Sequence, residues 1–135
     1  MYKFTFLINP ISGGGQGKIV HSFVPEIMTS MGFKPEEWKS ELTEGSRLRE
    51  QIRDAAADTK TLIAVGGDGT VSTVLSVMLE TDGLSKVKVG LIPLGTGNDL
   101  ARVLNLYGSF VNRGLLYLVR RLVMARSRPF DIWRV

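Results

Sequence analysis

The stretch TLIAVGGDGTVSTVL, residues 61–75, decides the fold. It begins with a short, continuously apolar run at Thr61–Val65, which is typical of a strand buried on both faces. The glycine loop Gly66–Thr70 follows directly, and Val71–Leu79 then carries apolar side chains at helical spacing. A buried strand, a glycine loop and a helix in this order predict one unit of a parallel β/α sheet.

The same unit recurs on both sides of this stretch. Tyr2–Ile8 is aromatic and β-branched, which predicts a strand, and it is followed by the loop NPISGGGQG and by helical spacing over Lys18–Met31. Downstream, a strand expected at Val87–Pro93 is followed by the loop LGTGN and a short helix at Asp99–Leu104. The other expected elements are a weak strand within 33–42 with a turn at 35–37, a helix over 43–57 with Ser46 as candidate N-cap, a helix over 114–124 and the start of a strand at 129–135.

The alternation of strands and helices predicts an α/β domain with three layers, α/β/α, around a mostly parallel sheet. In such sheets ligands bind beyond the carboxyl ends of the strands. Each of the three glycine clusters follows an expected strand. We therefore expect three loops that are far apart in the sequence to meet at one edge of the sheet, within a single domain over residues 1–135.

The composition is that of a globular protein, with 44% apolar and 22% charged residues. Cysteine is absent, which excludes disulfides, redox motifs and thiolate metal sites. No apolar stretch is long enough for a transmembrane helix, and the run Phe4–Ile8 is too short for a signal peptide. These features lead us to expect a cytoplasmic protein.

The positive charge is confined to the last quarter of the chain. Residues 100–135 contain seven arginines and one acid, Asp131, whereas residues 1–99 contain ten basic and twelve acidic residues. We interpret the arginines first as a solvated helix face; the alternatives are a phosphate-rich partner and an anionic membrane surface that binds the protein peripherally.

The first two loops have the composition of an anion site. Each loop has several glycines followed by a helix, which exposes backbone N–H groups. The first loop is not a P-loop, because Ile19 stands where a P-loop carries the Ser or Thr that binds magnesium. In the second loop Asp68 has three candidate roles, which are to accept hydrogen bonds from a ribose, to cap the helix or to bind a water of magnesium. Thr70 offers a hydroxyl to phosphate.

The third loop adds polar side chains at the next strand end. Thr96 and Asn98 supply a hydroxyl and an amide, and Asp99 suits the first turn of a helix. Arg102 is placed to reach phosphate or to pair with Asp99.

Four segments together resemble the catalytic domain of diacylglycerol kinases and related lipid kinases: NPISGGG, GGDGT, PLGTGNDLAR and FDIWRV. Sphingosine and ceramide kinases are relatives, and NAD kinases and phosphofructokinases are more distant ones that share GGDG. The resemblance covers the chain from Tyr2 to about Val135. It implies the N-terminal fold of phosphofructokinases and NAD kinases, and transfer of the γ-phosphate of ATP, with Mg²⁺, to a lipid hydroxyl such as that of diacylglycerol.

The resemblance also implies which residues bind ATP. Asp68 would be the candidate catalytic carboxylate of this chain, and metal ligands are not assigned. The sequence departs from bacterial relatives at residues 44–47 after Thr43, and at Thr73, where an acid is usual. The implied nucleotide-binding residues are Asn9, Pro10, Ile11, Ser12, Gly13, Thr43, Gly66, Gly67, Asp68, Gly69, Thr70, Thr96 and Asn98.

In such kinases a second, mostly β domain follows this one and supplies the general base. We therefore expect such a domain after residue 135, and no kinase activity from residues 1–135 alone. The alternatives are a sphingosine- or ceramide-type kinase and a non-catalytic nucleotide-binding module. A nucleic-acid partner is not expected, and His21 is expected to have a structural role.

Overall fold

The computed structural model describes residues 1–81 and 86–94. Four strands alternate with three helices in this part of the chain, and two short 3-10 helices lie at Pro35–Glu37 and Gly45–Arg47. The order is β1 (Tyr2–Ile8), α1 (Ser12–Ser30), β2 (Trp38–Leu42), α2 (Leu48–Ala57), β3 (Thr59–Gly66), α3 (Asp68–Glu80) and β4 (Lys88–Pro93).

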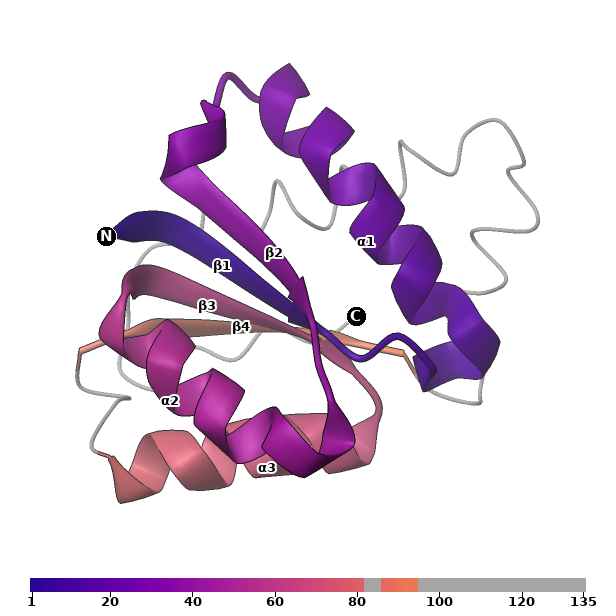
Figure 1. Ribbon diagram of the computed structural model, residues 1–135, viewed down its shortest axis with the longest axis vertical. Coiled ribbons are helices and arrows are strands. Elements are labelled where there is room, and N and C mark those ends of the chain that lie inside the picture. Colours follow the sequence, from indigo (N-terminus) through magenta and orange to yellow (C-terminus); the bar gives the residue numbers. More distant parts are fainter. Residues whose placement is uncertain (82–85, 95–135) are drawn as a thin grey trace.

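The four strands form one sheet in the order β2-β1-β3-β4, and every neighbouring pair is parallel (Figure 1). In the central register Phe6 lies between Ser40 of β2 and Ile63 of β3. All the strands therefore end at the same edge of the sheet, as the sequence predicts.

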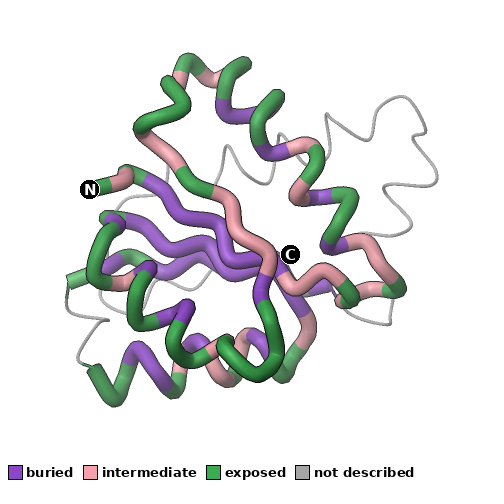
Figure 2. Tube along the Cα trace, in the orientation of Figure 1, coloured by how far each residue is buried: buried purple, intermediate pink, exposed green. Residues whose placement is uncertain are grey.

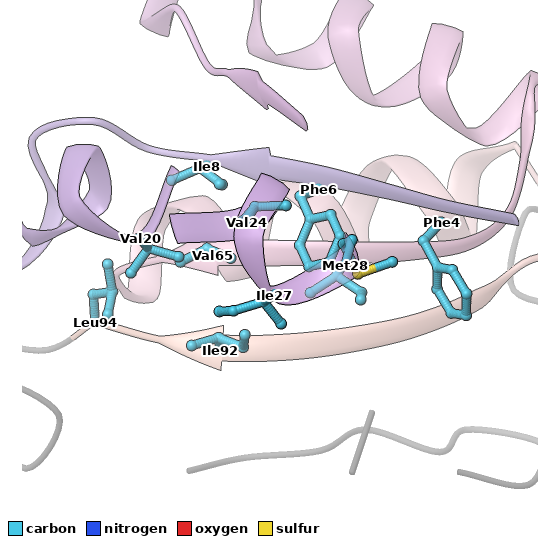
Figure 3. Close-up of a cluster of buried hydrophobic side chains, with 11 residues drawn as sticks. Phe4, Phe6, Ile8, Val20, Val24, Ile27, Met28, Val65, Ile92 and Leu94 are labelled. Atoms are coloured by element: carbon cyan, nitrogen blue, oxygen red, sulfur yellow. The ribbon is translucent and has the colours of Figure 1, made fainter. Parts of the chain in front are cut away.

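One face of the sheet packs against α1. The even-numbered side chains of β1 meet Val20, Val24, Ile27 and Met28 of the helix (Figure 3). Phe6, Ile8 and Met28 are completely buried, and burying side chains of this size contributes roughly 1.5–3 kcal/mol each. This apolar contact fixes the helix that follows the first glycine loop.

The opposite face packs against α2 and α3. Leu7, Leu62 and Leu91 of the sheet belong to one buried cluster with Ile52 of α2, to which α3 adds a buried stripe. Strands β1 and β3 are largely buried in the middle of the molecule, whereas the edge strand β2 and the outer sides of the helices are partly or fully exposed (Figure 2). The expected α/β architecture with helices on both faces of a parallel sheet is confirmed.

Helix α1 begins earlier than the expected start at Lys18. Its first turn forms at Ser12 and is interrupted at Gly13–Gly15, where φ is +61°, +67° and +94°. Glycine adopts this left-handed conformation without the steric cost that other residues meet. Pro25 lies inside the helix, which ends at Ser30.

Helix α2 begins later than expected, at Leu48 rather than at Thr43. The 3-10 turn Gly45–Arg47 precedes it, and the expected N-cap at Ser46 is wrong because Ser46 lies within this turn. Arg47 takes the N-cap position without a side-chain cap bond. Its guanidinium lies 3.4 Å from Glu44 and 3.5 Å from Glu50, and its amide closes the turn by donating to the Glu44 carbonyl at 2.9 Å.

Helix α3 begins at Asp68, three residues before the expected Val71. Gly67 is its N-cap, so Asp68 lies in the first turn and does not cap the helix. The buried side chains of α3 are Thr70, Val74, Val77 and Met78.

The weakly predicted segment 33–42 contains both features expected of it. The turn at Pro35–Glu37 is a 3-10 helix, and the strand is confined to Trp38–Leu42. Phe33 packs edge-on against Phe4, with ring centroids 5.2 Å apart. The helices expected at 99–104 and 114–124 and the strand at 129–135 lie outside the described residues.

Within residues 1–81 and 86–94, none of the helices has the length and apolar character needed to cross a bilayer.

Candidate functional site

The candidate site lies where β1 and β3 end side by side. From this point the chain leaves β1 toward α1 on one face of the sheet and leaves β3 toward α3 on the other face (Figure 1). The strand order reverses between these two strands, which is where open α/β sheets bind their ligands. The first and second glycine loops therefore meet, as the sequence predicts.

Asn9 connects the two loops at their base. Its Nδ2 donates a hydrogen bond to Thr70 Oγ1 at 3.0 Å, and its Oδ1 accepts one from the Ile11 amide at 3.1 Å. The Asn9 backbone amide donates to the Val65 carbonyl at 2.8 Å, which extends the pairing of β1 with β3. The asparagine side chain thus spans 61 residues of sequence with one hydrogen bond.

Ser12 makes a second connection, nearer the surface. The Gly67 amide donates to Ser12 Oγ at 3.1 Å. A serine hydroxyl carries one O–H donor and two acceptor lone pairs. Because the bond from Gly67 uses an acceptor position, the Ser12 O–H is left to donate to an anion at the rim of the loops.

Two of the glycines have a packing reason to be glycine. A Cβ on Gly66 would lie 2.8 Å from Thr70 Oγ1, and a Cβ on Gly17 would overlap the Asn9 carbonyl oxygen. Gly17 and Gly66 therefore let α1 and α3 approach the loops closely. Both positions shape the site from beneath.

At Gly67 and Gly69, by contrast, the packing does not require glycine. A Cβ on Gly67 would meet only ordinary contacts, 3.6 Å from the Leu94 carbonyl and 4.0 Å from Ser12 Oγ, and a Cβ on Gly69 would point into open space. Both residues lie in the loop and first turn beside Asp68. Open space over a glycine backbone suits the close approach of a ligand.

Asp68 is exposed at the first turn of α3. Among residues 1–81 and 86–94, the structure gives its carboxylate neither a hydrogen bond nor an ion pair, and it contains no cluster of three or more His, Asp or Glu residues that could hold a metal. Within the described residues, the carboxylate is therefore available to a ligand and belongs to no cluster of metal-binding side chains.

Thr43 follows β2 at the same sheet edge. It is buried, and its amide donates to the Ile8 carbonyl at 2.8 Å, which brings it beside the start of the first loop. The third loop is described only as far as Leu94, whose amide donates to the Gly66 carbonyl at 2.7 Å. Thr96 and Asn98 lie outside the described residues, and their expected roles stay predictions.

Gln51 of α2 is a residue that the sequence reasoning missed. Its Nε2 donates to the Leu42 carbonyl at 3.1 Å and its Oε1 accepts from the Glu44 amide at 2.9 Å, so it clamps the backbone on both sides of Thr43. The signal was present, because Gln51 occupies a buried position in the apolar stripe of Leu48, Ile52 and Ala55.

His21 has the structural contact expected of it. Its Nδ1 lies 2.7 Å from Ser40 Oγ, which joins α1 to β2. A separate polar groove of about 150 Å³ lies between α2 and the edge of the sheet. It is lined by Tyr2, Thr5, Lys39, Glu41, Arg47, Gln51, Asp54, Ala55 and Asp58, and therefore by none of the glycine-loop residues.

The sequence matches the family described as diacylglycerol kinase catalytic domain over residues 3–135. It is 35% identical over 131 residues to the eye-specific diacylglycerol kinase of Drosophila melanogaster, covering 95% of this chain and 8% of that protein. It is 36% identical over 137 residues to human diacylglycerol kinase iota, covering all of this chain and 12% of the relative. The chain thus spans about a tenth of the length of these relatives.

The fold is similar to that of a putative diacylglycerol kinase from Bacillus anthracis str. Sterne, with a TM-score of 0.57. The match covers 88% of this chain and 41% of that one at 22% sequence identity. It supports the fold assignment.

Proposed function

This chain belongs to the diacylglycerol kinase catalytic-domain family, and on that premise we propose that it is the ATP-binding part of a lipid kinase. In this proposal the γ-phosphate of ATP passes to a lipid hydroxyl, with diacylglycerol as the acceptor. The observation that carries it is the junction of two glycine loops at the ends of β1 and β3, where the Ser12 hydroxyl and the Gly67 amide lie 3.1 Å apart.

The phosphates would lie over this junction. Phosphoryl transfer depends on positioning and on stabilisation of negative charge. Donors for the phosphate oxygens would be the Ser12 O–H and the backbone amides of Gly13, Asp68 and Gly69, because the Gly67 amide already donates to Ser12 Oγ. Pro10 and Ile11 shape the first loop, and Thr43 stands beside it at the end of β2.

The exposed carboxylate of Asp68 is compatible with a magnesium ion that is held mainly by water and phosphate. Mg²⁺ in nucleotide sites usually keeps several waters and is bound by one or two carboxylates together with substrate phosphates. Asp68 is the exposed carboxylate of the second loop and would hold such an ion through water or hold the ribose. The ion would supply charge neutralisation to the phosphates when bound.

The proposal also includes how the lipid hydroxyl is activated. We assign the base that takes the proton from the lipid hydroxyl to a second, mostly β domain, so residues 1–135 alone would bind ATP without transferring phosphate at a useful rate. General-base catalysis contributes about 10²–10⁴-fold in rate. The arginines between 102 and 134 would face that domain or an anionic membrane.

ATP titration followed by NMR tests the proposal. We expect shifts at residues 9–13 and 66–70 and a dissociation constant in the micromolar to millimolar range, since about 5 mM ATP populates even a millimolar site. The substitution Gly67→Asp places a carboxylate where the phosphate approaches and should abolish binding.

Ser76→Asp is the matched control for this substitution. It adds the same charge on the exposed side of α3, away from the loops, and should leave the affinity unchanged. The proposal fails if the unsubstituted chain shows no shifts at about 5 mM ATP, which is well above a millimolar dissociation constant. It also fails if Gly67→Asp binds ATP as tightly as the unsubstituted chain does.

A further inference from the structure

The hydrogen bond between Asn9 and Thr70 has one buried partner, Thr70, whereas Ser12 and Gly67 of the neighbouring contact are both partly exposed. Thr70 is only 5% exposed, and its Oγ1 lies against the backbone of Gly66. Asn9 uses its Oδ1 on the Ile11 amide and an N–H on this hydroxyl. The polar atoms that join these two side chains are therefore engaged below the surface of the loops.

The contact between Ser12 and Gly67 lies close to this bond along both segments of the chain. Ser12 follows Asn9 by three residues, and Gly67 precedes Thr70 by three. The Ser12 amide also donates to the Asn9 carbonyl at 3.3 Å, and the Val71 amide donates to the Gly67 carbonyl at 3.1 Å. The backbone of each loop thus links the Asn9–Thr70 pair to the Ser12–Gly67 pair.

We propose that Asn9 is a positioning residue for phosphate: through its hydrogen bond to the buried Thr70 it sets the distance between the two glycine loops, and so places the Ser12 hydroxyl beside the Gly67 amide. Thr70 takes part as the acceptor of this bond and does not itself contact phosphate. The inference rests on the proposed function, because it assigns the phosphates of ATP to the Ser12–Gly67 junction.

A double-mutant cycle with ATP as the ligand tests this arrangement. Thr70→Val removes the acceptor and keeps the shape of the side chain, and Asn9→Leu removes the donor. Each single variant should bind ATP at least tenfold more weakly than the unsubstituted chain. The double variant should be no more than about twofold weaker than the weaker single variant, because coupled groups do not contribute additively.

Two further variants separate positioning from a general loss of stability. Thr70→Ser keeps the acceptor and should retain affinity within about threefold, as expected for partial preservation of a coupled contact. Thr59→Val makes the same chemical change at the other end of β3, where the Thr59 hydroxyl donates to the Thr61 carbonyl at 3.1 Å, and should leave ATP affinity unchanged.

The NMR signal of the Gly67 amide gives a readout without ligand. In Thr70→Val it should move in the free chain, because its bond to Ser12 loosens, and it should stay in place in Thr59→Val. Circular dichroism confirms that each variant is folded.

Three outcomes would overturn the inference. Fully additive losses in the cycle would make Asn9 and Thr70 independent ligand contacts. Unchanged ATP affinity in Thr70→Val would overturn the positioning role and leave the proposed function standing. Absence of ATP binding by the unsubstituted chain would overturn the proposed function and the inference with it.

Discussion

The two edges of the sheet are held by different kinds of interaction. At the amino edge, ions meet near the surface: the terminal amine lies 3.7 Å from the Asp58 carboxylate, and Lys3 Nζ lies 2.6 Å from Glu37. At the carboxyl edge, neutral groups meet, with the Asn9 amide bonded to the Thr70 hydroxyl.

The ion pairs of the amino edge only join parts of the chain, whereas the neutral polar groups of the carboxyl edge can also bind a ligand. Exposed ion pairs contribute little to stability, and their charges satisfy one another. At the carboxyl edge, amides and hydroxyls bring the loops together and leave an O–H donor facing outward. A binding site needs such fixed dipoles in place before the ligand arrives, because their orientation then costs little at the moment of binding.

Gly17→Ala should have the largest effect on the carboxyl edge. The new Cβ would overlap the Asn9 carbonyl oxygen, so α1 must move away from the loop. We expect the free energy of unfolding to fall by about 3 kcal/mol, measured by urea denaturation. Gly69→Ala is the control, because its Cβ points into open space, and it should change the value by less than about 1 kcal/mol. Equal effects of the two substitutions would contradict the close packing described for Gly17.

Asp68→Asn should affect ligand binding and leave the fold intact. The carboxylate interacts with the positive end of α3, so its loss should lower the free energy of unfolding by less than about 1 kcal/mol. ATP affinity in the presence of Mg²⁺ should fall about tenfold in calorimetry, as expected when a hydrogen bond to a charged group is lost. Asp54→Asn, on the exposed side of α2, serves as control. An unchanged affinity, with and without magnesium, would remove Asp68 from the site.

Glu37→Gln at the amino edge should have the smallest effect. The hydrogen bond from Lys3, assisted by the Lys34 amide, holds the pKa of Glu37 below its ordinary value of 4.5. This carboxylate therefore stabilises the fold above pH 4.5, and the contribution is lost as the pH falls through the lowered pKa. In urea denaturation the variant should be slightly less stable than the native chain at pH 7, the difference should vanish as the pH falls well below 4.5, and ATP binding should be unchanged. If the stability of the variant followed that of the native chain at every pH, Glu37 would not be the group responsible for this contribution.

The sheet and the meeting of the first two loops could be predicted from the sequence. The continuous apolar run at Thr61–Val65 and the alternation of strands with helices required a parallel sheet, and parallel strands end at one edge. Local pattern was sufficient here because burial and periodicity are properties of the segment itself. The expected strand Tyr2–Ile8 matches β1 residue for residue.

The features that could not be predicted depend on pairs of distant residues. The delayed start of α2 follows from the 3-10 turn Gly45–Arg47, which contains Ser46 and in which the Arg47 amide donates to the Glu44 carbonyl at 2.9 Å. The bond between Asn9 and Thr70 joins residues that local patterns treat separately. The sequence placed the first two loops together at the sheet edge, and the structure adds that Gly17 and Gly66 are packing positions.

The clamp that Gln51 places around Thr43 makes the end of β2 part of the same cooperative unit as α2. Because the Leu42 carbonyl and the Glu44 amide both bond to one side chain of the helix, the backbone around Thr43 cannot open to solvent while α2 remains docked. Local opening in proteins proceeds in such units and not residue by residue. The fluctuations available to Thr43 are therefore those of a whole helix, which are rarer and larger than those of a free loop.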